Sequence, residues 1–128
     1  MKTAGIWIIR IALGLMGLTL LYSGFMWAFM PADNLIANDI VAQSILGLNM
    51  VKSDIGGPLM AVGLMQLLFV FGKQQFLWPL VLISLSYFAV RTTSLIVDGS
   101  HPMIIAGIAM ELLVPALNLL LHKMRSSH

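Results

Sequence analysis

Cysteine is absent from the 128 residues of this chain. Without a thiol the chain can form no disulfide, no thiolate metal site, no iron–sulfur cluster and no cysteine nucleophile. The sequence also lacks a G-x-G-x-x-G pattern, a P-loop and a nucleophile motif. Three histidines at positions 101, 122 and 128 are too dispersed for a metal cluster, and the ten methionines fit apolar helix packing better than copper binding. We therefore expect a non-catalytic protein without a metal site.

Charge is scarce as well. Only 9% of the residues are charged while 59% are hydrophobic, and the mean hydropathy is +0.96. Soluble globular domains are roughly one-quarter charged, so this composition predicts an integral membrane protein. The formal net charge of +2 is too small to indicate nucleic acid as a partner. A chain of this length is expected to form a single domain.

Long apolar runs give the expected fold. A hydrocarbon core of about 30 Å requires about 20 apolar residues per helix, which predicts spans at about residues 5–30, 55–71, 76–97 and 102–121. The first run is expected to stay in place as an anchor, because it is much longer than the apolar region of a signal peptide. The extracytoplasmic loop 32–53 has apolar residues at helical spacing between acidic and amide residues. The prediction is all-α: an integral membrane four-helix bundle with a short interfacial amphipathic helix between the first and second spans.

The charged residues are divided unequally between the two sides of this arrangement. One side holds both chain ends and the turn at residues 72–75, and its charged residues are all basic: Lys2, Arg10, Lys73, Lys123 and Arg125. The other side holds only Lys52 and, deeper, Arg91 against the aspartates Asp33, Asp39, Asp54 and Asp98. Because cytoplasmic loops carry an excess of Lys and Arg, both termini are predicted to be cytoplasmic.

Polar residues on the third and fourth spans point to one site. At 100° per residue, a single stripe on the third span contains Ser84, Tyr87, Arg91, Ser94 and Asp98. On the fourth span Glu111 shares a face with Gly107 and Pro115, at a depth similar to that of Arg91. A tight turn joins the spans, so Arg91 and Glu111 are predicted to pair and avoid the cost of an isolated charge in lipid. The alternatives are an Arg91 that snorkels outward and a purely structural ion pair.

Asp54 is the third charge assigned to this site. It stands at the predicted start of the second span, where it or Ser53 would cap the helix. It also lies on the side of the membrane toward which Arg91 and Glu111 are displaced. The full set of predicted ligand-binding residues is Arg91, Glu111, Asp54, Asp98, Tyr87, Ser94, Tyr22, Trp27 and Asn49.

Several short motifs carry a family resemblance. They are Gly24, Trp27 and Pro31 in a G-x-x-W-x-x-x-P pattern, NMVKSDIGG at 49–57, Arg91 with Ser94, Asp98 with Gly99, and Glu111. Together they resemble the small bacterial four-helix membrane proteins of the DoxX-like type and neighbouring families of unknown function, over nearly the whole chain. The resemblance implies a four-helix bundle in the bacterial inner membrane. Some DoxX-like relatives are quinone-linked oxidoreductase subunits, although this chain has no ligand set for a redox cofactor of its own.

The main functional hypothesis is a non-catalytic membrane module with a polar site in its outward half. Arg91, Glu111 and Asp54 would bind a lipid head group, a quinone, a small anion or a partner helix, with the planar guanidinium engaging an oxygen of the ligand. A small proton-coupled transporter using Glu111 and an accessory subunit of a quinone-linked oxidoreductase are the alternatives. A lipid or a quinone is the cofactor class that these hypotheses imply. Expected partners are membrane lipids and either further copies of the chain, along the glycine face of the first span, or a larger membrane complex.

Overall fold

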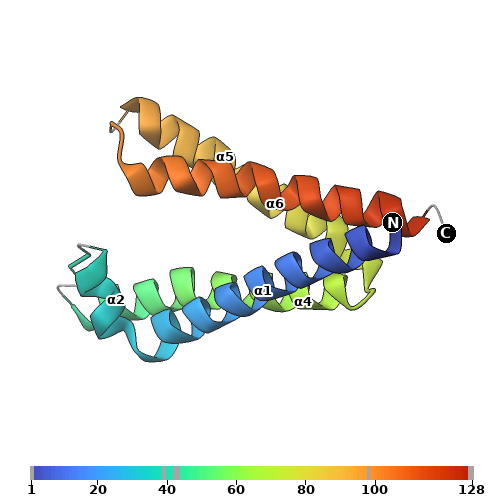
Figure 1. Ribbon diagram of the computed structural model, residues 1–128. Helices are drawn as coiled ribbons and strands as arrows, with labels where there is room; N and C mark the ends of the chain where they lie inside the picture. Colours follow the sequence, from blue (N-terminus) through green and yellow to red (C-terminus); the bar gives the residue numbers. More distant parts are fainter. Residues whose placement is uncertain (1, 39, 42–43, 98, 127–128) are drawn as a thin grey trace. The chain divides into compact units, whose positions relative to one another are not determined.

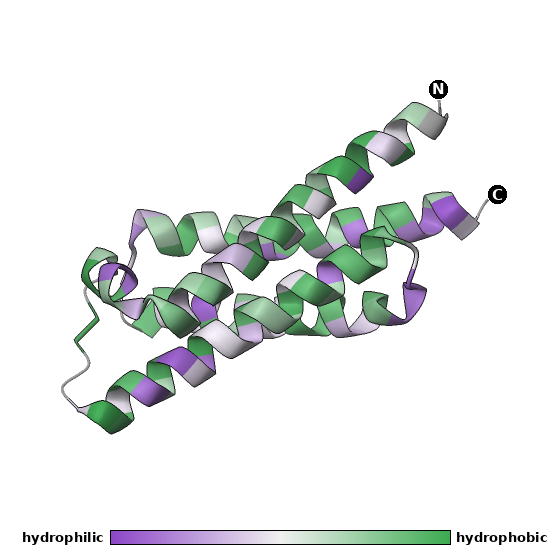
Figure 2. Ribbon diagram, turned by 90° about the horizontal axis from the view of Figure 1, so that it is seen from below, coloured by the Kyte–Doolittle hydropathy of each residue, from purple (hydrophilic) through white to green (hydrophobic). Residues whose placement is uncertain are grey.

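Helices make up every regular element in a computed structural model that describes residues 2–38, 40–41, 44–97 and 99–126 (Figure 1). Four helical stretches are long and apolar enough to cross a membrane: Ala4–Phe29, Ile45–Val70, Gln74–Val97 and Pro102–Ser126. Apolar residues dominate along all of them, as the hydropathy colouring in Figure 2 shows. The predicted all-α architecture with four spans is confirmed. The chain is a multi-pass membrane protein.

The bounds of the helices follow the predicted spans with one exception. The first, third and fourth spans correspond to α1 (Lys2–Phe29), to η2 (Gln74–Phe76) with α5 (Leu77–Val97), and to α6 (Pro102–Ser126). The second span consists of three consecutive segments: α3 (Ile45–Val51), the π-helical η1 (Lys52–Gly56) and α4 (Gly57–Val70). This span therefore starts at Ile45, and the prediction that residues up to 53 form a loop is wrong.

The early start of the second span has a local cause. Ser44 is extended, and its hydroxyl oxygen accepts a hydrogen bond from the backbone N–H of Gly47 at 3.0 Å, which caps α3. The predicted capping role of Ser53 or Asp54 is therefore wrong, because both lie inside the continuous helical stretch. Their polar side chains are exposed there, and the Ser53 hydroxyl donates to Asp54 Oδ1 at 3.0 Å.

A short helix lies between the first and second spans, as expected. It is α2 (Pro31–Ala37), and Pro31 occupies the first turn, where its missing N–H costs nothing. None of its residues is buried, and Ile36 is 78% exposed. Asp39 lies outside the described residues. The exposed apolar surface suits a position at the membrane interface, which stays a prediction.

Two compact units make up the chain, residues 14–68 and residues 1–13 with 69–128. We call them the central unit and the terminal unit. In the central unit, glycines allow α1 and the second span to approach closely. A Cβ on Gly63 would lie 2.5 Å from the backbone nitrogen of Leu21, and one on Gly24 would lie 2.5 Å from that of Met60. Gly17 and Gly24 on the glycine face of α1 thus pack against the second span within the chain, and association with further copies stays a prediction.

The terminal unit is built around the hairpin of α5 and α6 (Figure 1). Gly99 has a φ of +104° in the connection between the two helices, a conformation that favours glycine. The start of α1 lies beside the end of α6, since a Cβ on Gly5 would be 3.5 Å from the Met124 side chain. The buried apolar side chains of this unit are Leu13, Phe69, Val70, Leu77, Leu80, Val81 and Leu121.

Candidate functional site

An ion pair joins α5 and α6 within the terminal unit. The Nε of Arg91 donates to Oε1 of Glu111 at 2.5 Å, and the two side chains are 43% and 13% exposed, respectively. The pairing predicted from helical phase and depth is therefore present. It also argues against an Arg91 that snorkels outward, because one of its N–H groups is committed to a carboxylate.

The direction of the two side chains explains why they meet. In an α-helix the Cα–Cβ bond tilts toward the amino terminus of the helix. Arg91 lies near the end of α5 and therefore leans back from the hairpin turn, whereas Glu111 lies nearer the start of α6 and leans toward the turn. The two helices run in opposite directions from a short connection, so the side chains converge on one level.

Gly107 lies directly under the guanidinium group. A Cβ at this position would be 2.8 Å from Nη1 of Arg91 and 2.9 Å from its Cζ. Both distances are well inside van der Waals contact. The absence of a side chain on α6, one turn before Glu111, therefore lets the planar group of Arg91 lie against the helix backbone.

Replacing Gly107 by alanine is expected to push the guanidinium away from its carboxylate partner. Alanine in a helix is normally worth about 1 kcal/mol relative to glycine. We expect Gly107→Ala to lose that gain or to destabilise the protein, because Arg91 must move. Unfolding in mixed detergent micelles, followed by circular dichroism, measures the effect.

Gly5→Ala provides the matched control, because an added Cβ would meet only the Met124 side chain at an ordinary contact distance of 3.5 Å. Equal stabilisation by the two substitutions would show that the Arg91 guanidinium does not lie against Gly107.

The ion pair leaves part of each partner unengaged. Within the described residues, Nε makes the only hydrogen bond of the Arg91 side chain, so Nη1 and Nη2 have no acceptor there. Oε2 of Glu111 is buried and has no hydrogen-bond partner among the described residues. The covered carboxylate faces the protein while the arginine is partly exposed, so a ligand would reach the pair from the Arg91 side.

Two further residues near the pair in sequence leave a polar group without its usual partner among the described residues: Thr92 and Pro115. Thr92 follows Arg91, and its hydroxyl oxygen is buried without a hydrogen-bond partner in the described part of the chain. A single threonine in an apolar run gives no signal in the sequence, so this group was not predicted. Pro115, one turn after Glu111, is buried within α6 and has no N–H for the Glu111 carbonyl.

The other predicted site residues fall into three groups. On α5, Tyr87 is 43% exposed and Ser94 is partly exposed. Asp98 lies outside the described residues. The remaining four belong to the central unit, where Trp27 is buried, Tyr22 is 66% exposed, and Asn49 and Asp54 are exposed. That these four share a site with Arg91 stays a prediction.

Arg125 makes contacts with the end of α4 that helical phase and hydropathy do not predict. Its Nη1 donates to the carbonyl oxygen of Phe69 at 2.9 Å, and its Nη2 donates to that of Val70 at 2.5 Å. Carbonyls in the last turn of a helix have no intrahelical partner and attract cations. Arg125 therefore caps the end of α4 from α6. Nearby, Nδ1 of His122 and Oε1 of Gln74 are 2.8 Å apart, which ties α6 to η2.

Comparison with models of protein families, with curated proteins and with solved structures gives no match. Any functional interpretation therefore depends on the chain itself. Its relevant features are four apolar helices of membrane-spanning length and an ion pair between the third and fourth spans. Among the described residues no group of three His, Asp or Glu side chains is placed to hold a metal ion.

Proposed function

We propose that this chain is a non-catalytic membrane module that uses Arg91 to bind a ligand through an anionic or carbonyl oxygen. One observation carries the proposal: the guanidinium is fixed by Glu111 and Gly107, yet only its Nε donates a hydrogen bond within the described residues. A planar arginine held in this way presents its two Nη groups to a partner oxygen. A lipid head group and a quinone both supply such an oxygen at the depth of the site.

Glu111 acts as a positioning residue in this proposal. It holds Arg91 at one level of the membrane and offsets its charge, so that the site is close to neutral before the ligand binds. Asp54, in the central unit, stays a predicted second carboxylate on the same side of the membrane. Its exposed position in η1 leaves it accessible.

The proposal includes an orientation in the bacterial inner membrane with both termini in the cytoplasm. The support is the charge distribution: basic residues without an acid at the end that holds both termini, and aspartates near the opposite ends of the spans. In this orientation Arg91 and Glu111 lie in the half of the bilayer farther from the cytoplasm. The DoxX-like resemblance of the sequence is consistent with this arrangement, and a quinone as ligand would connect the chain to a quinone-linked oxidoreductase as an accessory subunit.

Native mass spectrometry of the protein extracted with its own lipids tests the proposal. We expect wild-type protein to retain a lipid or quinone, and Arg91→Lys to weaken retention by about tenfold or more, because lysine keeps the charge but loses the fork of donors. The unfolding midpoint of Arg91→Lys in the same detergent controls for loss of the fold.

The identity of the retained molecule decides between the ligand classes. A quinone favours the accessory-subunit role, and a phospholipid favours a lipid-binding module. Equal retention by wild type and by folded Arg91→Lys would reject Arg91 as the ligand-binding residue. Wild-type protein that retains neither class would reject the binding function itself.

A further inference from the structure

A second arginine is arranged for a ligand at the other end of the terminal unit. Arg10 lies on α1 with its Cζ 4.6 Å from the centroid of the Trp7 ring, one turn nearer the start of the helix. The side chain therefore bends back toward the helix start, as side chains on a helix tend to do. Arg10 is about 9 Å along the helix from the first residue of the span, a distance that a bent-back arginine largely covers.

Arg10 has no hydrogen-bond acceptor in the described part of the chain. Its Nε is buried without a partner in those residues, and its guanidinium lies over the Trp7 ring. A buried guanidinium N–H without an acceptor costs free energy comparable to a lost hydrogen bond. The site therefore favours a molecule that brings an acceptor oxygen.

The surroundings of Arg10 are positively charged. The charge of Arg10 acts on Arg125, whose two Nη groups are already bound to the carbonyl oxygens of α4. Residues 2–13, 69–80 and 117–126, which form this end of the terminal unit, contain no Asp or Glu. The repulsion between the two arginines thus has no carboxylate in these segments to offset it, and an anion would supply the missing charge.

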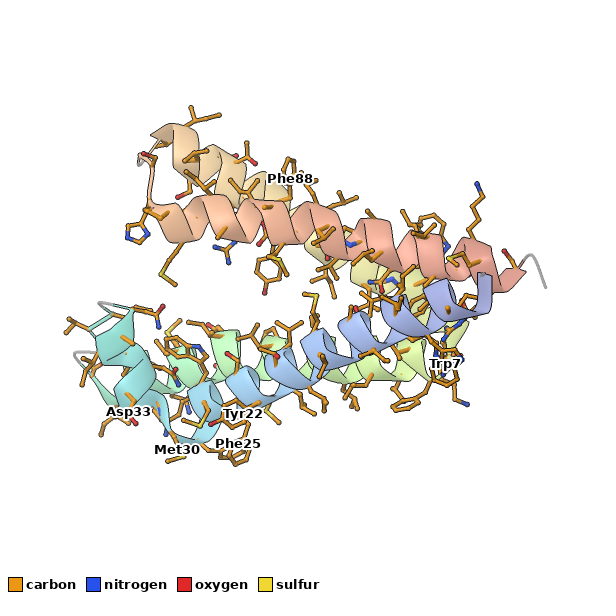
Figure 3. The ribbon with its side chains drawn as sticks, viewed as in Figure 1. Trp7, Tyr22, Phe25, Met30, Asp33 and Phe88 are labelled. Atoms are coloured by element: carbon orange, nitrogen blue, oxygen red, sulfur yellow. The ribbon has the colours of Figure 1, made fainter. Side chains whose placement is uncertain are left out.

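The neighbouring surface favours a lipid as the source of that anion. Trp7 is 54% exposed and projects from the first turns of α1 (Figure 3). Ile8 and Ile11, next to Trp7 and Arg10, are 68% and 58% exposed. An aromatic ring at the end of a span marks the head-group level, and exposed isoleucines below it contact acyl chains. A molecule that fits both features has an anionic head and apolar tails.

We propose that Arg10, with Arg125 adding positive charge at the same end of the terminal unit, binds the phosphodiester of an anionic phospholipid in the leaflet there. Arg10 donates to the phosphate oxygens, Trp7 holds its guanidinium at head-group level, and Arg125 adds charge while its Nη groups cap α4. Basic pockets beside membrane helices are suited to such head groups. This site is separate from Arg91 and does not depend on the function proposed for it.

Native mass spectrometry from nanodiscs that contain equal amounts of phosphatidylglycerol and phosphatidylcholine tests the site. We expect wild-type protein to retain phosphatidylglycerol under activation that strips phosphatidylcholine. Arg10→Gln should lower this preference by about fivefold, the effect of one basic residue near an anionic surface. Arg10→Lys should give an intermediate value, because the charge remains while the fork and the ring stacking are weakened.

Lys52→Gln is the matched control, since it removes the same charge from η1 in the central unit and should leave the preference unchanged. No preference in wild type, or equal losses in Lys52→Gln and Arg10→Gln, would overturn the proposal. Displacement of phosphatidylglycerol by excess inorganic phosphate would assign the site to a free anion and would also overturn it. If Arg10→Gln does not fold, an Arg10→Lys variant with wild-type preference would count against the site.

Discussion

Gly63→Ala is expected to destabilise the protein by about 1–3 kcal/mol, the usual cost of forcing extra volume into a packed interface. The added Cβ would lie 2.5 Å from the backbone nitrogen of Leu21 and 2.8 Å from the carbonyl oxygen of Gly17. Both are backbone atoms of α1, so no side chain can rotate away and the helices themselves must separate. Reversible unfolding in mixed detergent micelles measures the change.

Gly57→Ala is the control for this experiment. Gly57 begins the same helix, α4, but an added Cβ there would have no neighbour within 4 Å. Alanine should therefore be neutral or stabilising by about 0.5–1 kcal/mol, through helix propensity alone. If Gly63→Ala and Gly57→Ala had the same unfolding midpoint, the close approach of α1 and α4 would be disproved.

Removing the carboxylate of the ion pair should have the largest effect. Glu111→Ala leaves Arg91 charged and unpaired within an apolar bundle, and truncating one partner of such a pair typically costs about 2–5 kcal/mol. Glu111→Gln should cost less, because the amide oxygen still accepts a hydrogen bond from Nε. The same unfolding assay compares these variants.

A double replacement separates the loss of the pair from the loss of packing. Arg91→Leu combined with Glu111→Leu removes both charges from an apolar environment, where ionic pairs are often replaced without net cost. We expect the double variant to recover most of the stability that Glu111→Ala loses. It should bind no ligand at position 91, because the guanidinium is gone. A Glu111→Ala variant as stable as wild type would show that Arg91 does not need its partner.

The ion pair was predictable from the sequence because two simple rules converge on it. Helical phase places Arg91 and Glu111 on polar faces, and the short connection between their helices gives them similar depths. The four membrane-spanning helices were predictable from local sequence as well, since each corresponds to a long apolar run. These properties depend on residues that are neighbours along one helix or one hairpin.

The features that escaped prediction depend on contacts between distant segments. The contact between Gly107 and the guanidinium depends on the conformation of the Arg91 side chain. The cap that Arg125 forms on α4 depends on the end of α4 lying beside α6. The start of the second span was misplaced for another reason. Lys52, Ser53 and Asp54 lower the local hydropathy, so a hydropathy argument ends the span there. The helix nevertheless continues through them, with Ser53 and Asp54 exposed and Lys52 half-buried.

The π-helical geometry of η1 has a consequence for comparing this chain with relatives of different length. A π turn accommodates one residue more than an α turn, and it can convert to α-helix when that residue is lost. A relative with a single-residue deletion within Lys52–Gly56 could therefore keep the register of Gly63 against α1 and also the face that α3 presents, because the lost residue is the extra one of the π turn. A one-residue gap in an alignment at this point would thus be compatible with an unchanged surface around Asn49 and an unchanged glycine interface of α4.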